Sequence, residues 1–414
     1  MAISTSARQE WRRYGFLPIA AALGYATSVL HIYSIGPFIE PLQQEFGWSR
    51  GQVSSGITIA SFLSALFCIP IGMLVDRMGP RRVGLIGVVL MGATVAMLST
   101  ASGSTQQWIL LWGVIALANL WVQATIWTSA VNSRFEASRG LALAITLSGA
   151  SVSATVFPLL GTWLIGDYGW RTAYIAMSGL WVALVFPILF LFFRGALDKD
   201  KRPSAAAAVT PPKVLKGLTM AQGLRSAAFY KLLMAGGMFA FTALGVIVHF
   251  VPILTDSGAD KLEAAGIAAL VGIFSIIGRL TTGMLLDRFP GHLVGGFAFL
   301  LPLSGCALLL LDGANPMSQM LAAAIFGLTL GSEVDVIAYL AAKYFGMKNF
   351  GALYGALVMA LSMGTAFGPL AAGMVYDSFN SYAPFLMLMM VLMTISSIAL
   401  FSLKSAPTAA ALAG

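Results

Sequence analysis

The sequence predicts an all-α membrane protein with about twelve transmembrane helices in two pseudo-symmetric six-helix bundles. Of its 414 residues, 58% are hydrophobic and only 10% are charged, whereas about a quarter of the residues of a soluble domain are charged. The apolar runs reach the roughly 20 residues that one span requires. No alternating barrel pattern accompanies them, and backbone in lipid must satisfy its own hydrogen bonds, so the spans are predicted to be helices.

Breaks at charged residues and at Gly/Pro-rich segments define the predicted spans. In the first half they cover residues 15–41, 54–76, 82–102, 106–133, 140–166 and 170–194. In the second half they cover residues 228–253, 263–287, 291–312, 316–343, 351–376 and 381–405. A Lys-, Pro- and Ala-rich stretch separates the halves and is typical of a linker. We therefore predict an N-terminal bundle at 1–194, a cytoplasmic linker at 195–227 and a C-terminal bundle at 228–414.

Lys and Arg residues in the short connections predict the orientation, because positive residues are retained on the cytoplasmic side. The even-numbered connections carry Arg77, Arg81, Arg82, Arg134, Arg139, Arg288, Lys343 and Lys348, and the odd-numbered ones little beyond Arg50, Arg171 and Lys261. Both termini are predicted to be cytoplasmic, in a multi-pass protein of the inner (plasma) membrane. The net charge of +8 is scattered over these loops, so no nucleic-acid partner is predicted.

Cysteine usage and motifs argue against an enzyme. Cys68 and Cys306 lie in apolar stretches of different halves, which favours neither a disulfide framework nor a Cys-rich metal site. The patterns GxGxxG, GxxxxGK and HExxH do not occur in the sequence, so neither nucleotide binding nor zinc-protease chemistry is indicated. We predict no enzymatic activity, no catalytic residue, no cofactor and no metal.

An internal repeat relates the two halves. Gly72-Met-Leu-Val-Asp76-Arg77 at the end of the second span recurs as Gly283-Met-Leu-Leu-Asp287-Arg288 at the end of the eighth. The same offset also aligns Pro41 with Pro252, Gly140 with Gly351, and Pro158 with Pro369. Agreement at four places indicates a duplication that gives both halves the same orientation. Parallel halves with a binding site near the midplane between them are typical of transporters that work by alternating access.

The loop after the second span carries a family resemblance. Gly72-Met-Leu-Val-Asp76-Arg77-Met-Gly79-Pro-Arg81-Arg82 resembles the G-x-L-x-D-R-x-G-x-R-R loop of the major facilitator superfamily, and the resemblance covers the whole chain. It implies a cytoplasmic gate formed by Gly72, Asp76, Arg77, Gly79, Arg81, Arg82, Asp287 and Arg288. The simpler alternative is a topology signal with glycines for tight turns. The recurrence of an aspartate among the arginines favours the gate, since a carboxylate is stabilised at a helix N-terminus.

Three ionisable residues fall inside predicted spans, where such residues are by default functional hypotheses. Arg279 lies in span eight and Glu333 in span ten, both about 14 Å inside the cytoplasmic boundary, and Asp335 follows Glu333 by two residues. An ion pair with either acid is conceivable, but the acids are about 200° apart around their helix and cannot both face one partner. Arg279 either packs in such a pair or binds a substrate carboxylate through its fork of donors. Ser275 shares its face of the helix.

Charge counting in this region suggests proton coupling. Two acids and one Arg carry a net charge of −1 when all are ionised, and an anionic substrate would add to it in a low-dielectric site. Proton uptake by Glu333 or Asp335 would relieve the excess.

Polar residues of the first and fourth spans complete the predicted binding residues. His31 and Tyr33 lie in the first span, and Asn119 and Gln123 in the fourth. An offset of 210 residues aligns Gln123 with Glu333, and a neutral amide opposite an acid suits asymmetric recognition. Packing against a backbone partner is the alternative for His31.

Within the superfamily, the sequence resembles the monocarboxylate transporters and oxalate/formate exchangers. The resemblance rests on Arg279 in GRLTTG, on the segment from His249 to Gly258, and on YSIGPFIEPLQQEFGWS, where Tyr33 matches a position associated with substrate. Mammalian members commonly place an aspartate one turn before the Arg, where this chain has Ser275. The resemblance implies carboxylate transport.

The leading functional prediction is therefore a monomeric secondary transporter of small organic anions, namely aliphatic or aromatic mono- or dicarboxylates. Transport would be coupled to protons or to a counter-anion. The alternative is proton-driven efflux of drugs or metabolites, which the abundant Met and Phe residues would permit. Arg279 distinguishes the two, because a pump for cationic drugs gains nothing from a buried Arg.

Overall fold

The computed structural model describes residues 5–66, 78–195, 217–346 and 348–403. Its secondary structure there is helical apart from one isolated bridge between Gly217 and Gly346, which confirms the predicted all-α class. Nine helices within the described residues are long and apolar enough to cross a bilayer. The chain forms two compact units. Unit 1 comprises Met1–Pro203 with Lys261–Gly272, and unit 2 comprises Ser204–Asp260 with Ile273–Gly414.

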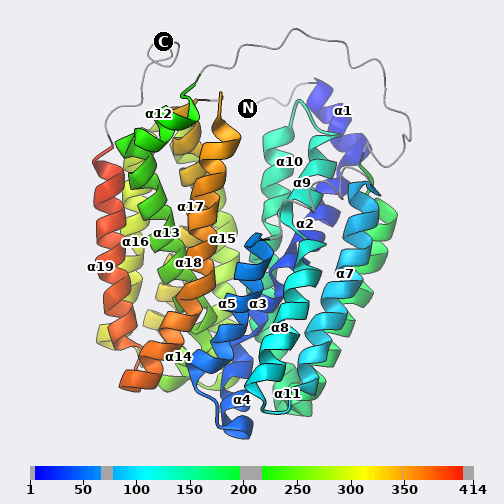
Figure 1. Ribbon diagram of the computed structural model, residues 1–414, viewed down its shortest axis with the longest axis vertical. Coiled ribbons are helices and arrows are strands. Elements are labelled where there is room, and N and C mark those ends of the chain that lie inside the picture. The colour runs from blue at the N-terminus through cyan, green and yellow to red at the C-terminus, as the bar shows by residue number, and fades with distance from the viewer. Residues whose placement is uncertain (1–4, 67–77, 196–216, 347, 404–414) are drawn as a thin grey trace. The chain divides into compact units, whose positions relative to one another are not determined.

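Most helices of unit 1 are shorter than the predicted spans, with the exception of α11 (Figure 1). In chain order they are α1 Thr5–Tyr14, α2 Phe16–Ser28, α3 Leu30–Ser34, η1 Gly36–Phe38, α4 Ile39–Phe46, α5 Arg50–Leu66, α7 Pro80–Ala96, η2 Met97–Thr100, α8 Thr105–Leu120, α9 Ala124–Asn132, α10 Arg139–Leu147 and α11 Gly149–Phe192. The first predicted span is thus divided, in part because Pro37 cannot continue the helical hydrogen bonding. The fourth is divided at Gln123, whose backbone is extended.

Spans five and six meet in a helical hairpin inside α11. The rings of Phe157 and Trp181 lie 4.8 Å apart, although a straight helix would separate these residues by about 36 Å. Ser153 and Trp181 also bond to neighbouring residues of α2. The reversal occurs at Gly169, where φ is 75° and ψ is 161°. Two predicted spans therefore stand side by side within α11.

Unit 2 contains longer, mostly uninterrupted helices. They are α12 Met220–Arg225, α13 Ala227–Val248, α14 Phe250–Asp256, α15 Lys261–Arg288, α16 Gly291–Asp312, α17 Pro316–Phe345, α18 Phe350–Phe379 and α19 Ala383–Phe401, of which α15 belongs to this unit from Ile273 onward. The short α12 lies within the predicted linker and begins with a capping box between Thr219 and Gln222.

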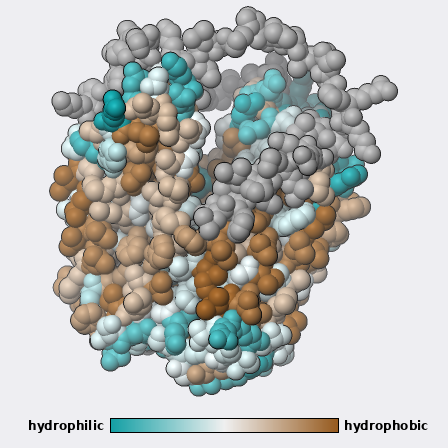
Figure 2. All heavy atoms as spheres, viewed as in Figure 1, coloured by the Kyte–Doolittle hydropathy of each residue, from teal (hydrophilic) through white to brown (hydrophobic). Residues whose placement is uncertain are grey.

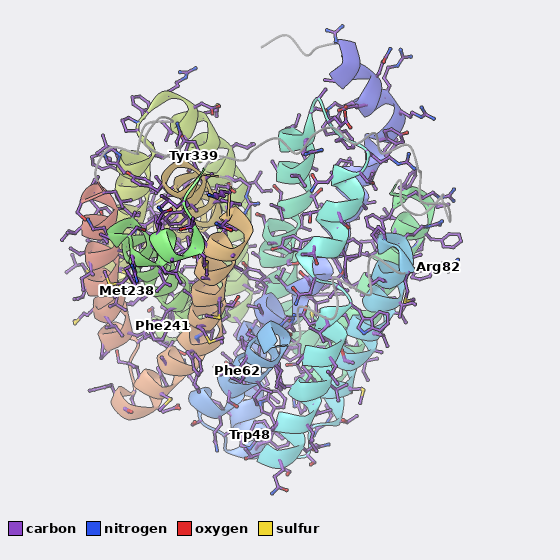
Figure 3. The ribbon with its side chains drawn as sticks, turned by 45° about the horizontal axis from the view of Figure 1, so that its top comes forward. Trp48, Phe62, Arg82, Met238, Phe241 and Tyr339 are labelled. Atoms are coloured by element: carbon purple, nitrogen blue, oxygen red, sulfur yellow. The ribbon has the colours of Figure 1, made fainter. Side chains whose placement is uncertain are left out.

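Equivalent helices pack against each other in the two units through glycine. In unit 1, Gly149 of α11 lies against the carbonyl group of Ala22 in α2. In unit 2, Gly368 of α18 lies against the carbonyl group of Phe241 in α13, which is labelled in Figure 3. Small residues permit such close backbone approach between membrane helices. Span one therefore packs against span five, as span seven packs against span eleven, although the two glycines stand at different positions of the repeat.

Exposed side chains match a lipid environment. Large apolar residues such as Leu110, Leu180 and Leu311 are more than half exposed on the helix flanks. Figure 2 shows hydrophobic residues along the helix flanks of the visible face and hydrophilic residues mainly near the helix ends. Apolar exposure on this scale would be unfavourable in water, so the flanks are suited to contact lipid.

The hairpin turn supplies a test of the fold. Gly169→Ala should lower thermal stability, because its backbone conformation is essentially reserved for glycine and strain of this kind costs about 1–3 kcal/mol. Scanning fluorimetry of purified protein would measure the change. Gly166→Ala is the matched control, since a Cβ there meets open space. Equal melting temperatures for both variants and the wild type would contradict the assigned turn.

Candidate functional site

An ion pair between α15 and α17 is the centre of the candidate site in unit 2. Arg279 Nε lies 3.7 Å from Asp335 Oδ2, and the two side chains are 14% and 30% exposed. That distance is too long for a hydrogen bond, and Arg279 Nε has no hydrogen-bond partner within the described residues. Of the two acids that the sequence leaves open as partners, the structure places Asp335 beside Arg279.

Two glycines bring the backbones of α15 and α17 into contact at this pair. A Cβ on Gly331 would overlap the carbonyl oxygen of Ser275 and lie 2.8 Å from the backbone nitrogen of Arg279. A Cβ on Gly278 would likewise overlap the carbonyl oxygen of Leu328. The helices therefore cross one turn from Asp335. Sequence analysis misses Gly331, although its spacing of one helical turn from Asp335 is a usable signal.

Glu333 has different surroundings from Asp335. It is 4% exposed, and its Oε1 is buried without a hydrogen-bond partner in the described part of the chain. Its face of α17 also carries Phe326 and Thr329, which line a small apolar cavity with Phe239 and Pro302. Burying an ionised carboxylate among such groups is costly. The fold thus pairs one acid of span ten with an arginine and buries the other inside the unit.

The polar residues predicted in unit 1 lie among aromatic and small side chains. His31 on α3 is 2% exposed, and its ring lies edge-on to Trp112 of α8 at 6.1 Å between centroids. Within the described residues, neither His31 ring nitrogen nor Trp112 Nε1 has a hydrogen-bond partner. Asn119 lies two turns along α8 from Trp112 and donates to Ser64 Oγ at 3.3 Å. Sequence analysis misses Trp112 and Ser64, because their proximity depends on packing between helices.

The other predicted binding residues lie near helix breaks or in packed positions. Tyr33 is half-buried on α3, and Gln123 is half-buried immediately before α9. Ser275 is buried on α15. His249, part of the family resemblance, is fully buried between α13 and α14, 2.7 Å from the hydroxyl of Tyr382 and 2.9 Å from the carbonyl oxygen of Pro369.

The predicted gate is described only in part, since Gly72, Asp76 and Arg77 lie outside the described residues. Gly79 precedes α7 with φ of 81°. Arg81 donates to the carbonyl oxygen of Phe190 and lies 5.2 Å from the centre of its ring, and Arg82 is exposed at the start of α7 (Figure 3). Asp287 and Arg288 are exposed at the end of α15. The gating role stays a prediction.

Substitution of Gly331 tests the crossing. Gly331→Ala should separate α15 from α17 and lengthen the Arg279–Asp335 distance, because the new methyl group would meet backbone atoms that cannot rotate away. Lower thermal stability and lower transport are expected together. Gly283→Ala is the control, as its Cβ meets nothing within 4 Å. A Gly331→Ala protein with the same thermal stability and the same transport rate as Gly283→Ala would refute the contact.

Comparisons with known proteins agree with the geometry. A family model described as the Major Facilitator Superfamily matches residues 21–337. Monocarboxylate transporter 13 of Rattus norvegicus is 25% identical over 378 residues, covering 89% of this chain and 84% of that protein. A chloramphenicol resistance protein of Streptomyces lividans is 25% identical over 350 residues, covering 82% and 84% respectively. These relatives span nearly the whole chain.

A solved structure provides a comparison of the fold. The inward-facing structure of a bacterial homologue of the human lysosomal transporter Spinster matches with a TM-score of 0.70 at 18% sequence identity. The match covers 94% of this chain and 96% of that chain. At this identity the match shows the fold alone.

Proposed function

Since the chain belongs to the Major Facilitator Superfamily, we propose that this membrane transporter carries small organic anions, aliphatic or aromatic mono- or dicarboxylates, by alternating access. The observation that supports this substrate class is Arg279. Its guanidinium is largely buried, forms a long ion pair with Asp335, and has an Nε donor without a hydrogen-bond partner in the described residues. The relatives named monocarboxylate transporter favour the same class.

Arg279 has the chemistry for carboxylate recognition. A guanidinium stays ionised and presents donors in a planar fork that matches the two oxygens of a carboxylate. The Asp335 carboxylate satisfies the charge of Arg279 but forms no hydrogen bond to Nε at 3.7 Å. A substrate carboxylate can therefore gain hydrogen bonds that Asp335 does not make. Substrate would take the place of Asp335 as the principal counter-charge.

Displacement of Asp335 provides a route to proton coupling. Once substrate neutralises Arg279, the Asp335 carboxylate would be left charged in a low-dielectric site, which is unfavourable. A proton taken from water onto Asp335 removes that charge and accompanies the substrate. Glu333 is the second candidate proton carrier, because it is buried and does not pair with Arg279. Exchange for a counter-anion, without a proton, is the other way to balance the charge.

The remaining parts of the proposal follow from the sequence. Tyr33, His31, Asn119, Gln123 and Ser275 are proposed as further substrate contacts. The protein is proposed to act as a monomer in the inner (plasma) membrane with both termini in the cytoplasm, and with bundles at 1–194 and 228–414 joined by a cytoplasmic linker.

Efflux of drugs or metabolites is the second candidate. It is favoured by the similarity to the chloramphenicol resistance protein of Streptomyces lividans. Proton antiport of a neutral or cationic compound would not require the donors of Arg279. Whether the transport of carboxylates or of chloramphenicol depends on Arg279 therefore distinguishes the two functions.

Substitution of Arg279 tests the substrate class. Protein reconstituted in liposomes would be presented with radiolabelled L-lactate, pyruvate, oxalate, benzoate and chloramphenicol. Arg279→Ala and Arg279→Lys should reduce carboxylate uptake by at least about tenfold, since a hydrogen bond to a charged group contributes about 1.5–3 kcal/mol. The exposed Arg225→Ala serves as control. Transport of chloramphenicol alone, unaffected by Arg279→Ala, would reject carboxylate transport.

Proton coupling makes a separate prediction. Asp335→Asn should flatten the pH dependence of carboxylate uptake while preserving exchange of labelled for unlabelled substrate, because exchange needs no net proton movement. Uptake would be measured with the pH gradient and the membrane potential imposed independently. If Asp335→Asn keeps the wild-type pH profile and Glu333→Gln changes it, the proton site is Glu333. If both variants keep the wild-type pH profile, neither acid is the proton site.

A further inference from the structure

A single carboxylate in α1 joins the N-terminal segment to the loop before α10. Glu10 accepts hydrogen bonds from the backbone N–H groups of Glu136, Ala137 and Ser138 at 3.0, 2.9 and 3.1 Å, and from the Ser138 hydroxyl at 2.9 Å. Ser138 precedes α10 and makes no side-chain cap of its own. Glu10 therefore satisfies donors at the entrance of a helix more than a hundred residues away in the sequence.

Aromatic and cationic contacts extend the junction to the end of span six. The ring of Trp11 lies 5.1 Å from that of Phe135, which is fully buried. The Arg134 guanidinium lies 5.0 Å from the Tyr14 ring centre and donates to the Tyr14 hydroxyl at 3.4 Å. It also donates to the carbonyl oxygen of Gly195 at 3.0 Å, just beyond α11. Figure 1 shows α1 at the end of unit 1 beside α9 and α10.

We propose that α1 is a strap that fastens this end of unit 1, with Glu10 as its clasp. Only Gly15 separates α1 from α2, so the strap holds the beginning of span one against the ends of spans four and six and the start of span five. Movement of span one is then confined to its interruptions at Val29 and Ile35, which flank His31. The strap would act in the same way whichever substrate the protein carries.

The charge of Glu10 keeps the strap closed at neutral pH. The hydrogen bond from the backbone of Ala137, helped by those from Glu136 and Ser138, holds the pKa of Glu10 below its ordinary value. A carboxyl group whose pKa is lowered on folding stabilises the folded state at any pH above its ordinary pKa. This stabilisation is lost as the pH falls through the lowered pKa. The clasp therefore stays fastened at neutral pH and is lost only as the pH falls through the lowered pKa of Glu10.

Hydrogen–deuterium exchange of the full-length protein in lipid nanodiscs tests the strap. In Glu10→Gln and Glu10→Ala, the amides of residues 136–138 should exchange on the order of tenfold faster, because they lose a charged acceptor. Exchange should also rise at residues 190–195, which Glu10 does not touch, and at the start of α2. Trypsin should cleave faster after Arg12 and Arg13, both exposed on α1. Glu10→Asp, which retains the charge on a shorter side chain, should be intermediate.

Glu136→Gln is the matched control, because it changes an exposed side chain of the same loop and keeps the backbone N–H that bonds Glu10. Unchanged exchange at 136–138 in the Glu10 variants would refute the clasp. Faster exchange at 136–138 with no change at 190–195 or in α2 would reduce Glu10 to a local cap and refute the strap. If Glu10→Ala does not accumulate, Glu10→Gln and Tyr14→Phe, which removes the hydroxyl facing Arg134, carry the same test.

Discussion

Close backbone contact at glycine is the constraint on which the helix packing depends. Inside a bilayer, burial of apolar surface does not drive helices together, because lipid is as apolar as the side chains. Association then comes from van der Waals packing, interhelical hydrogen bonds and lipid entropy, and the packing part requires near approach of the helices. Gly149 provides this approach between α11 and α2, Gly368 between α18 and α13, and Gly278 with Gly331 between α15 and α17. The positions of the polar side chains follow from these crossings.

The helix crossing at Gly331 sets the geometry of the Arg279–Asp335 ion pair. A partly buried ion pair gains Coulomb energy but loses hydration, and the net effect on stability is often small. At 3.7 Å, without a hydrogen bond to Nε, this pair is not optimised for stability. The same looseness is useful to a binding site, since a ligand has only a weak internal competitor to displace. Glu333, two residues along the same helix, is buried inside the unit and would take no part in the proposed exchange of partners at Arg279.

Much of the architecture could be predicted because it depends on composition and repetition. Apolar runs show where spans lie, and the recurrence of Asp76 as Asp287 shows that the halves are duplicated. The predicted spans do not contain the interruptions of span one and span four, because apolar residues continue through both, although Pro37 is a visible signal for part of the break in span one. The clasp at Glu10 was missed because its partners are distant in sequence and are backbone groups, which no residue pattern marks. Arg279 was found because a charge in an apolar run stands out, but its partner required coordinates.

The two halves differ around Gln123 in span four and Glu333 in span ten, which an offset of 210 residues aligns, one residue less than the offset of the repeat. In unit 1 the helix is interrupted at Gln123, and the carbonyl oxygen of Val122 that the break releases accepts a hydrogen bond from Trp127 Nε1 at 2.8 Å. In unit 2, α17 continues unbroken through Glu333 and Asp335. A broken helix exposes carbonyl dipoles whose negative ends repel an anion, so a neutral amide suits that position. In a continuous helix the carbonyl groups accept hydrogen bonds from the helix itself. The charged side chains then dominate the local electrostatic field. The duplication thus supplies one frame for both halves, and the two spans differ within it in backbone continuity and in charge.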